Sequence, residues 1–195
     1  RLESNAPHRA SNRPDDPDFW VNRLPYQSQI SRSAYRIFKR AFDLSIVILS
    51  VPVTFPLGVL IALLTYLDSG KPIFFKQQRT GLGGHRFTMY KFRTMVPNAE
   101  EMLRDLAAQG LAQLDASGKL AAPLKLDKDP RISRVGRILR KTSLDELPQL
   151  LNVLRGEMSL VGPRPTSWDL GSYSLPQTER LNAKPGITGL WQVYG

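Results

Sequence analysis

Residues 44–67 contain no charged side chain, and this uncharged stretch constrains the fold more than any other feature of the sequence. As one straight helix its roughly 24 residues would extend about 36 Å, which exceeds the roughly 30 Å hydrocarbon core of a bilayer. Pro52 and Pro56 lie near the middle of the stretch. Because a proline inside a helix removes a hydrogen bond and kinks the helix, we expect a bent segment that enters a membrane and returns.

Basic side chains flank this apolar segment at both ends. They are Arg32, Arg36, Lys39 and Arg40 before it, and Lys71, Lys76 and Arg79 after it. Because the cytoplasmic flanks of membrane segments attract Lys and Arg, a re-entrant hairpin satisfies both ends, whereas a spanning helix leaves one on the wrong side. The alternative is a buried core helix of a soluble protein, although so long an uncharged stretch exceeds what one small core needs.

The composition of the 195-residue chain excludes several kinds of catalytic site. There is no cysteine, so disulfides, thiolate metal ligands and cysteine nucleophiles are ruled out. The two histidines, His8 and His85, lie in a polar leader and beside glycines, which argues against a Ser-His-Asp triad or a multi-histidine metal site. The formal charge of +10 indicates an anionic partner, for which nucleic acid, an anionic membrane face and phosphorylated small molecules all qualify.

Glycine and proline signals divide the chain into a polar lead-in over residues 1–32 and a single domain over residues 33–195. Phenylalanine-rich runs on both sides of the glycine-rich residues 81–84 predict a short β-hairpin. A phosphate-binding loop is the alternative there, but no P-loop lysine and hydroxyl follow in a strand–loop–helix context. The expected fold is therefore an α-rich α/β domain with a re-entrant helical hairpin, interfacial amphipathic helices and a short β-hairpin.

Three further helices are expected after the β-hairpin. Asn98 and Glu101 have the spacing of a capping box that begins one helix, and Arg155-Gly156 ends another. Residues 131–141 place apolar side chains on one helical face and largely basic side chains on the other. Such a helix is either a solvated face over an ordinary core or an interfacial helix that lies on anionic headgroups.

The stretch TSLDELPQL at residues 142–150 places two carboxylates, Asp145 and Glu146, side by side in a strongly basic chain. One interpretation is helix-start chemistry, because Ser143 and Glu146 have the S-x-x-E spacing of a capping box. The other is phosphate chemistry, because a carboxylate can attack phosphorus to form an acyl phosphate while a neighbouring carboxylate holds Mg²⁺. A helix N-terminus at this point would keep Asp145 ionised and favour a bound phosphate.

A proline on each side of Arg164, in the sequence GPRP at residues 162–165, fixes the local backbone. This reduces the entropy lost when the guanidinium is presented to a ligand, so Arg164 is a better anion-site candidate than an ordinary loop arginine. Together with the carboxylate pair, the apolar segment and the basic charge, this loop points to phosphate chemistry at a membrane.

Five stretches of the sequence together match one family pattern. They are KRAFDL at 39–44, PIFFKQQRTG at 72–81, YKFRTM at 90–95, DPRISRVGRILRKTSLDELPQLLNVLRGEMSLVGPRP at 129–165 and KPGITGLWQVYG at 184–195. The combination of RKTSLDELPQL with GPRP is highly specific. Over residues 36–195 the chain therefore resembles the bacterial sugar transferase family, the monotopic phosphoglycosyl transferases.

The resemblance implies transfer of a phosphosugar from a UDP-sugar to undecaprenyl phosphate, with release of UMP, to begin assembly of exopolysaccharide, capsule, O-antigen or another glycan. It implies that Asp145 is the nucleophile, through a covalent aspartyl-phosphosugar intermediate, and that Glu146 supports the cofactor Mg²⁺. The residues implied in substrate binding are Lys91, Arg140, Arg164 and Pro165. The resemblance also implies a re-entrant segment, broken at Pro52 and Pro56, on the cytoplasmic face of the bacterial inner membrane, with anionic lipids as partners.

Two features depart from the family pattern. Phe55 precedes Pro56 where many relatives have serine, so we expect Thr54 or Ser50 to bond a carbonyl that the prolines free. The pattern also continues beyond Gly195, so we expect a chain that is cut short there.

Two functions of other classes compete with the transferase. A nucleic-acid-binding module would explain the charge but not a long uncharged stretch broken by two prolines, so no nucleic-acid partner is expected. A non-catalytic basic membrane scaffold would explain the apolar segment and the basic helix, but it gives the carboxylate pair no role. The sequence leaves open which sugar is transferred and whether the chain forms a homo-oligomer.

Overall fold

The structure is a computed structural model that describes residues 32–113, 129–167, 179–190 and 192. The chain divides into two units, Arg1–Lys39 and Arg40–Gly195. The predicted lead-in, apart from the backbone of Arg32, lies outside the described residues. All contacts described below lie within the second unit.

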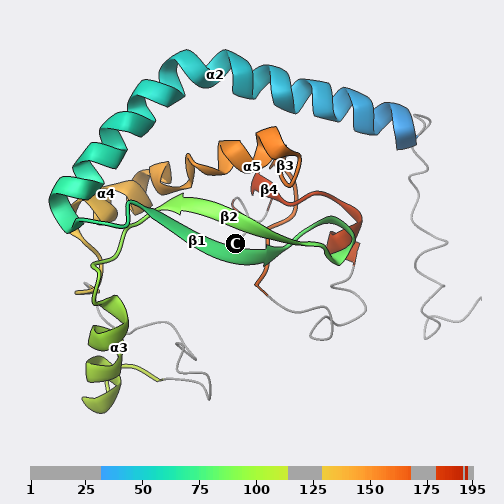
Figure 1. The fold of residues 1–195 in the computed structure, drawn as a ribbon. Coiled ribbons are helices and arrows are strands. Elements are labelled where there is room, and N and C mark those ends of the chain that lie inside the picture. The colour runs from blue at the N-terminus through green and yellow to red at the C-terminus, as the bar shows by residue number, and fades with distance from the viewer. Residues whose placement is uncertain (1–31, 114–128, 168–178, 191, 193–195) are drawn as a thin grey trace, which may run out of the picture. The chain divides into compact units, whose positions relative to one another are not determined.

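The apolar segment lies in one long helix, α2, which runs without interruption over Arg32–Ser69 and contains Pro52 and Pro56. The predicted helical hairpin is therefore not seen, because no loop separates two arms, although Figure 1 shows that the part of α2 within the second unit is bent. Val47 and Ile61, on either side of the two prolines, are both buried in the core. Re-entry into a membrane stays a prediction.

Among the described residues, α2 is the one helix long and apolar enough to cross a membrane, with a mean hydropathy of 2.5 over its most apolar window. Only 11% of that window is buried within the chain, and large apolar side chains such as Leu49, Val53 and Phe55 are exposed. The core helix of a soluble protein buries most such side chains. The exposure of α2 therefore disfavours the core-helix alternative.

The hydroxyls near the prolines form different bonds from those predicted. Ser50 Oγ donates to the Val47 carbonyl at 2.7 Å, and Thr54 Oγ1 donates to the Ser50 carbonyl at 3.0 Å. The carbonyls that the prolines free are those of Ile48 and Pro52, four residues before each ring. The prediction that Ser50 or Thr54 satisfies a freed carbonyl is wrong, because each hydroxyl bonds back to the carbonyl three or four residues before its own position.

The predicted β-hairpin is confirmed. β1 (Phe74–Thr80) pairs antiparallel with β2 (Arg86–Phe92), and a short 3₁₀ turn, η1 (Leu82–Gly84), joins them. Gly83 in this turn has a φ of 62°, a left-handed conformation that a side chain would oppose. The glycine-rich residues therefore serve as a turn, as expected.

Short helices and strands follow the hairpin. In chain order they are α3 (Ala99–Ala108), α4 (Arg134–Thr142), the 3₁₀ turn η2 (Leu144–Glu146), α5 (Gln149–Arg155), β3 (Ser159–Val161), the 3₁₀ turn η4 (Glu179–Asn182) and β4 (Gly186–Thr188). β3 and β4 pair in parallel. Each of these two strands has only three residues, too few to show the alternation from which a strand is predicted.

The ends of the helices agree with the sequence signals in position but not always in capping. α3 begins directly after Asn98, but the Asn98 side chain accepts no capping hydrogen bond, so the predicted capping box is not formed. α4 has a side-chain cap instead, because Ser133 Oγ accepts from the Gly136 N–H at 3.0 Å. α5 ends as predicted, with Gly156 at a φ of 80° directly after Arg155.

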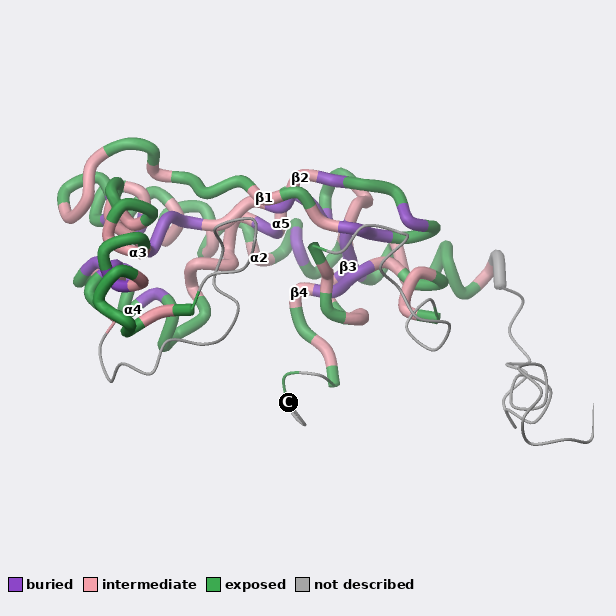
Figure 2. The backbone as a smooth tube through the Cα atoms, turned by 90° about the horizontal axis from the view of Figure 1, so that it is seen from below, coloured by how far each residue is buried: buried purple, intermediate pink, exposed green. Residues whose placement is uncertain are grey.

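Two clusters of buried apolar side chains form the core of the second unit. The first contains Val47, Phe87, Met89, Val153 and Met158. The second contains Ile61, Phe92 and Leu139. Figure 2 shows buried residues along β2 and at the start of β3. Since α2 and β2 contribute to both clusters, they fix α4 and α5, and with them the turn η2 that joins these two helices.

Candidate active site

The two carboxylates, Asp145 and Glu146, lie in η2, the 3₁₀ turn between α4 and α5. α4 ends at Thr142, and Ser143 follows in the left-handed conformation with a φ of 56°. The Ser143 side chain accepts no capping bond, while its carbonyl accepts from the Glu146 N–H at 3.2 Å. The predicted capping box is therefore wrong, because Ser143 caps the C-terminus of α4 through its backbone instead of capping a following α-helix through its hydroxyl.

Glu146 is tied to the β-hairpin through Lys91 of β2. Lys91 Nζ lies 2.6 Å from Glu146 Oε1, in a charge-assisted hydrogen bond between side chains that are 24% and 21% exposed. Because both groups are largely shielded from water, this pair holds its geometry better than a surface ion pair would. Two predicted site residues that are far apart in the sequence therefore meet.

Asp145 is only partly exposed, and charged groups of both signs lie near it. Burial raises the pKa of its carboxyl above the ordinary aspartate value, Lys91 and Arg140 lower the pKa, and Glu146 raises it. The net shift is upward. The expected helix N-terminus is not found at this point, because Asp145 lies in the 3₁₀ turn η2. The two neighbouring cations are what favours the charged form of this carboxyl.

Arg140 reaches this neighbourhood because α4 is docked against the chain that follows β2. Arg140 Nε donates to Thr94 Oγ1 at 2.9 Å, and the Ser133 N–H donates to the Thr94 carbonyl at 3.0 Å. A Cβ on Gly136 would lie 2.1 Å from that same carbonyl oxygen, so the close approach of the two backbones requires glycine. This packing brings Arg140 close enough to act on the charge of Asp145.

The loop that carries Arg164 reaches the site through the end of β1. An isolated antiparallel bridge joins Thr80 to Thr166, and the Thr80 N–H donates to the Thr166 carbonyl at 2.9 Å. Arg79, the residue before Thr80, is close enough to Arg164 and Glu146 for both charges to act on its guanidinium. Sequence reasoning missed Arg79, because its position marked it only as a basic flank of the apolar segment.

Most of the predicted site residues are thus brought together around η2. These are Asp145, Glu146, Lys91, Arg140 and Arg164. Pro165 lies in the loop, next to the bridge residue Thr166. Pro52 and Pro56 belong to α2, where both are exposed, and are not part of this charged cluster.

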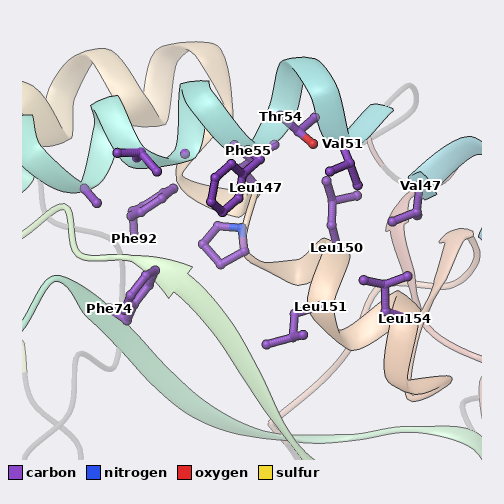
Figure 3. Close-up of a pocket in the computed structure, with 14 residues that line it drawn as sticks. Val47, Val51, Thr54, Phe55, Phe74, Phe92, Leu147, Leu150, Leu151 and Leu154 are labelled. Carbon is purple, nitrogen blue, oxygen red and sulfur yellow. The ribbon is translucent and has the colours of Figure 1, made fainter. Parts of the chain in front are cut away.

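An apolar pocket of about 370 Å³ lies beside the charged cluster. One of its walls is α2, and the others come from Phe74 and Phe92 of the β-hairpin, from α5, and from Leu147 and Pro148, which directly follow Glu146. The rings of Phe74 and Phe92 stack at 5.3 Å between centroids. Figure 3 shows the lining side chains between α2 on one side and the hairpin and α5 on the other. Apart from Thr54, all of the lining residues are apolar.

The carboxylate pair fits a divalent cation that arrives with a substrate. Among the described residues, no group of three or more histidine, cysteine, aspartate or glutamate side chains could hold a metal ion. Mg²⁺ bound together with a diphosphate needs only one or two carboxylates, because phosphate oxygens and water complete its coordination. Asp145 and Glu146 can supply these carboxylates, although Lys91 already bonds one oxygen of Glu146.

The comparison with protein families agrees with these features of the fold and the site. The sequence pattern of the bacterial sugar transferases matches residues 34–195, which is most of the chain. The chain belongs to the bacterial sugar transferase family.

Several curated proteins are similar to this chain. The undecaprenyl-phosphate galactose phosphotransferase of Salmonella typhimurium is 44% identical over 176 residues, which are 90% of this chain and 36% of that protein. The exopolysaccharide production protein ExoY of Sinorhizobium fredii is 41% identical over 173 residues, 88% of this chain and 75% of ExoY. The UDP-glucose:undecaprenyl-phosphate glucose-1-phosphate transferase of Caulobacter vibrioides is 44% identical over 170 residues, 85% of this chain and 57% of that protein. The chain thus spans between about a third and three quarters of these relatives.

Proposed function

We propose that this chain is the catalytic part of a phosphoglycosyl transferase, which moves a phosphosugar from a UDP-sugar to undecaprenyl phosphate and releases UMP. The observation that carries the proposal is the partly buried Asp145, surrounded by cations and adjacent to an apolar pocket. The names of the Salmonella and Caulobacter relatives state sugar-phosphate transfer with undecaprenyl phosphate, and that of ExoY states exopolysaccharide production. Such a transfer would begin the assembly of a polysaccharide.

Asp145 is the nucleophile in this proposal. A carboxylate oxygen of Asp145 attacks the phosphorus that carries the sugar, and the bond from that phosphorus to the bridging oxygen of the diphosphate breaks. UMP leaves with the electron pair of that bond, and an aspartyl-phosphosugar remains. A phosphate oxygen of undecaprenyl phosphate then attacks the same phosphorus, which restores the Asp145 carboxylate and yields the lipid diphosphosugar.

The cations around η2 support both steps. Lys91 and Arg140 lower the pKa of Asp145 against the effect of burial, so they increase the fraction of Asp145 that is ionised and able to attack. The same cations, with Arg164, can stabilise the negative charge that develops on the phosphoryl oxygens and on the departing UMP. Glu146 holds Lys91 in place through the bond at 2.6 Å.

Mg²⁺ is proposed as the cofactor, held by Glu146 with Asp145 nearby. When bound, it supplies positive charge that neutralises the diphosphate and stabilises the leaving phosphate. Glu146 would then share its carboxylate between Lys91 and the metal, so its two oxygens serve different cations. Chelation of divalent metal is expected to stop turnover, and an undiminished rate in excess EDTA would remove the metal from the proposal.

The apolar pocket suits the isoprenoid chain of the acceptor. Its lining is almost wholly apolar, and it adjoins Leu147 and Pro148, which directly follow the carboxylate pair. A lipid phosphate whose first isoprene units lie in this pocket would therefore present its phosphate toward Asp145. Since the pocket is bounded by the exposed apolar helix α2, the lipid chain could continue into the bilayer beside that helix.

We place the domain on the cytoplasmic face of the bacterial inner membrane. The apolar side chains of α2 are exposed along its length, and the exposed face of α4 carries Arg134, Arg137 and Lys141, which suit anionic lipid headgroups. UDP-sugars are cytoplasmic substrates, which requires the site to face that side. Entry and return of α2 on one face would keep its basic flanks together on the cytoplasmic side.

The experiment that tests the function is measurement of UMP release from a panel of UDP-sugars. The protein is held in nanodiscs with Mg²⁺ and undecaprenyl phosphate, and the Asp145→Asn variant is measured in parallel. Release by wild type alone would support the proposal and identify the sugar. Equal release by Asp145→Asn would contradict the nucleophile, and no release from any sugar by either this chain or a longer form would leave the membrane scaffold as the better account.

A further inference from the structure

Arg79 is a charged residue that the proposed mechanism does not use. It lies in β1, one residue before Thr80, and its side chain is only partly exposed. Its Nη2 donates to Gln77 Oε1 at 2.7 Å, which orients the guanidinium along the strand. Its Nε is buried and has no hydrogen-bond partner. A guanidinium in this position retains donors that its own surroundings do not satisfy.

Arg79 also lacks a carboxylate partner of its own. Within the described part of the chain it forms no ion pair at salt-bridge distance, and Glu146, the acidic residue whose charge acts on it, is bonded to Lys91. Burial lowers the pKa of the Arg79 guanidinium, Arg164 lowers it further and Glu146 opposes this. Two guanidiniums that repel one another are thus held close together at the edge of the site.

The fold enforces this closeness. The bridge between Thr80 and Thr166 clamps the end of β1 to the residue after Pro165, so Arg79 and Arg164 cannot easily move apart. Arg86 of β2 reinforces the bridge, because its Nη1 donates to Thr80 Oγ1 at 3.1 Å and to the Ser167 carbonyl at 3.4 Å. An anion bound between the two guanidiniums would offset the repulsion that this closeness costs.

The charges around η2 indicate what the anion is. The cations are Lys91, Arg79, Arg140 and Arg164, and the carboxylates are Asp145 and Glu146. Among these described residues the cations outnumber the carboxylates, which suits an anionic group such as the diphosphate of a nucleoside diphosphate sugar. Guanidinium forks also suit paired phosphate oxygens better than ammonium groups do.

We propose that Arg79 and Arg164 form an arginine pair that binds the diphosphate of the nucleotide sugar, with Arg79 as a substrate-binding residue. This assignment rests on the proposed function, because it assumes that the site around Asp145 takes a nucleoside diphosphate sugar. The buried Nε of Arg79 becomes satisfied when a phosphate oxygen approaches it. The repulsion between the two guanidiniums is relieved at the same time, so binding energy is gained from both effects.

The test compares Arg79→Gln with wild type and with Lys76→Gln, a matched control that removes an exposed cation from the same strand. UDP affinity is measured by calorimetry on the nanodisc-held protein, and KM and kcat for the UDP-sugar are measured separately. Because a hydrogen bond to a charged group contributes about 1.5–3 kcal/mol, Arg79→Gln is expected to weaken UDP binding and raise KM roughly 10- to 100-fold. Lys76→Gln is expected to leave both values near those of wild type.

Two further variants separate binding from structure. Arg79→Lys keeps the charge but not the fork, so it is expected to recover part of the lost affinity. Arg79→Gln combined with Arg164→Gln is expected to lose less affinity than the two single losses added together, because both residues bind the same group. A merely structural Arg79 would lower Tm and kcat in Arg79→Gln while UDP affinity and KM stayed unchanged.

The outcomes distinguish this inference from the function on which it rests. Wild-type turnover with unchanged UDP affinity in Arg79→Gln would overturn the role of Arg79 and leave the transferase intact. If UDP binding depends on Arg79 but the protein turns over no UDP-sugar, the arginine pair is supported and the proposed reaction is contradicted. A wild-type chain with neither measurable affinity for UDP nor turnover on any UDP-sugar would overturn both.

Discussion

Asn152→Ala is the substitution whose effect on stability can be worked out most fully from the structure. Asn152 lies on α5 and is completely buried. Its Oδ1 accepts from the Tyr90 N–H at 3.2 Å, and its Nδ2 donates to the Thr88 carbonyl at 2.7 Å and to Glu157 Oε2 at 2.6 Å. One side chain therefore connects α5 to β2 through two backbone groups of the strand.

Truncation to alanine removes all three bonds and leaves the two backbone groups of β2 without these partners. Each group that loses its partner costs about 1–3 kcal/mol, and partial access of water to Thr88 and Tyr90 favours the lower end of that range. The expected loss of stability is therefore about 2–4 kcal/mol. For a chain of this size, 1 kcal/mol corresponds to about 2–4 °C in Tm, so we expect a decrease of roughly 5–15 °C.

The assay is thermal unfolding in nanodiscs, followed by circular dichroism at the helical band, with kcat measured well below Tm. Arg155→Gln is the matched control, because Arg155 also bonds β2 from α5, through the Tyr90 hydroxyl at 2.9 Å, but is exposed. We expect little change in Tm for the control and a lower kcat for Asn152→Ala, since α5 no longer fixes η2. A Tm for Asn152→Ala that stays within about 2 °C of wild type would refute this reasoning.

Three further predictions concern the site and its supports. Burial raises the pKa of Asp145 and Lys91 opposes this shift, so Lys91→Gln should move the acidic limb of the pH–kcat profile to higher pH. An unmoved limb would show that Lys91 does not influence the protonation of the nucleophile. Gly136→Ala would place a Cβ 2.1 Å from the Thr94 carbonyl oxygen, so it should destabilise the fold by about 1–3 kcal/mol or more and lower Tm. An unchanged Tm would contradict the tight packing of α4. Leu151→Glu puts a charge into the apolar pocket, so it should raise KM for undecaprenyl phosphate but not KM for the UDP-sugar. Equal changes in the two KM values would argue against a lipid in the pocket.

The parts of the fold that the sequence predicts correctly are those with strong local signals. Aromatic runs on both sides of a glycine turn predict the β-hairpin, and the Arg155-Gly156 pair predicts the end of α5. The carboxylate pair and Arg164 also stand out in the sequence, because their motifs are compact, while their roles stay predictions. These predictions depend only on neighbouring residues, and tertiary contacts do not override them.

The wrong predictions fail where tertiary contacts outweigh a local signal. The prolines are a separate case, because α2 is continuous across them while a membrane break at Pro52 and Pro56 stays a prediction. The Ser143–Glu146 spacing suggests a capping box, but Ser143 is needed as the left-handed C-cap of α4. Arg79 joins the site only through the pairing of Thr80 with Thr166, and no local pattern reveals contacts between such distant segments.

The central claim is that Asp145 forms a covalent bond with the phosphosugar, and mass spectrometry of the protein tests it most directly. Wild type and Asp145→Asn are mixed with the UDP-sugar and Mg²⁺ without acceptor, quenched in acid within seconds and digested. The account predicts a phosphosugar on the wild-type peptide that contains Asp145, absent from the variant and discharged when undecaprenyl phosphate is added. Full wild-type turnover with no adduct at any quench time, or an adduct on a different residue, would contradict it.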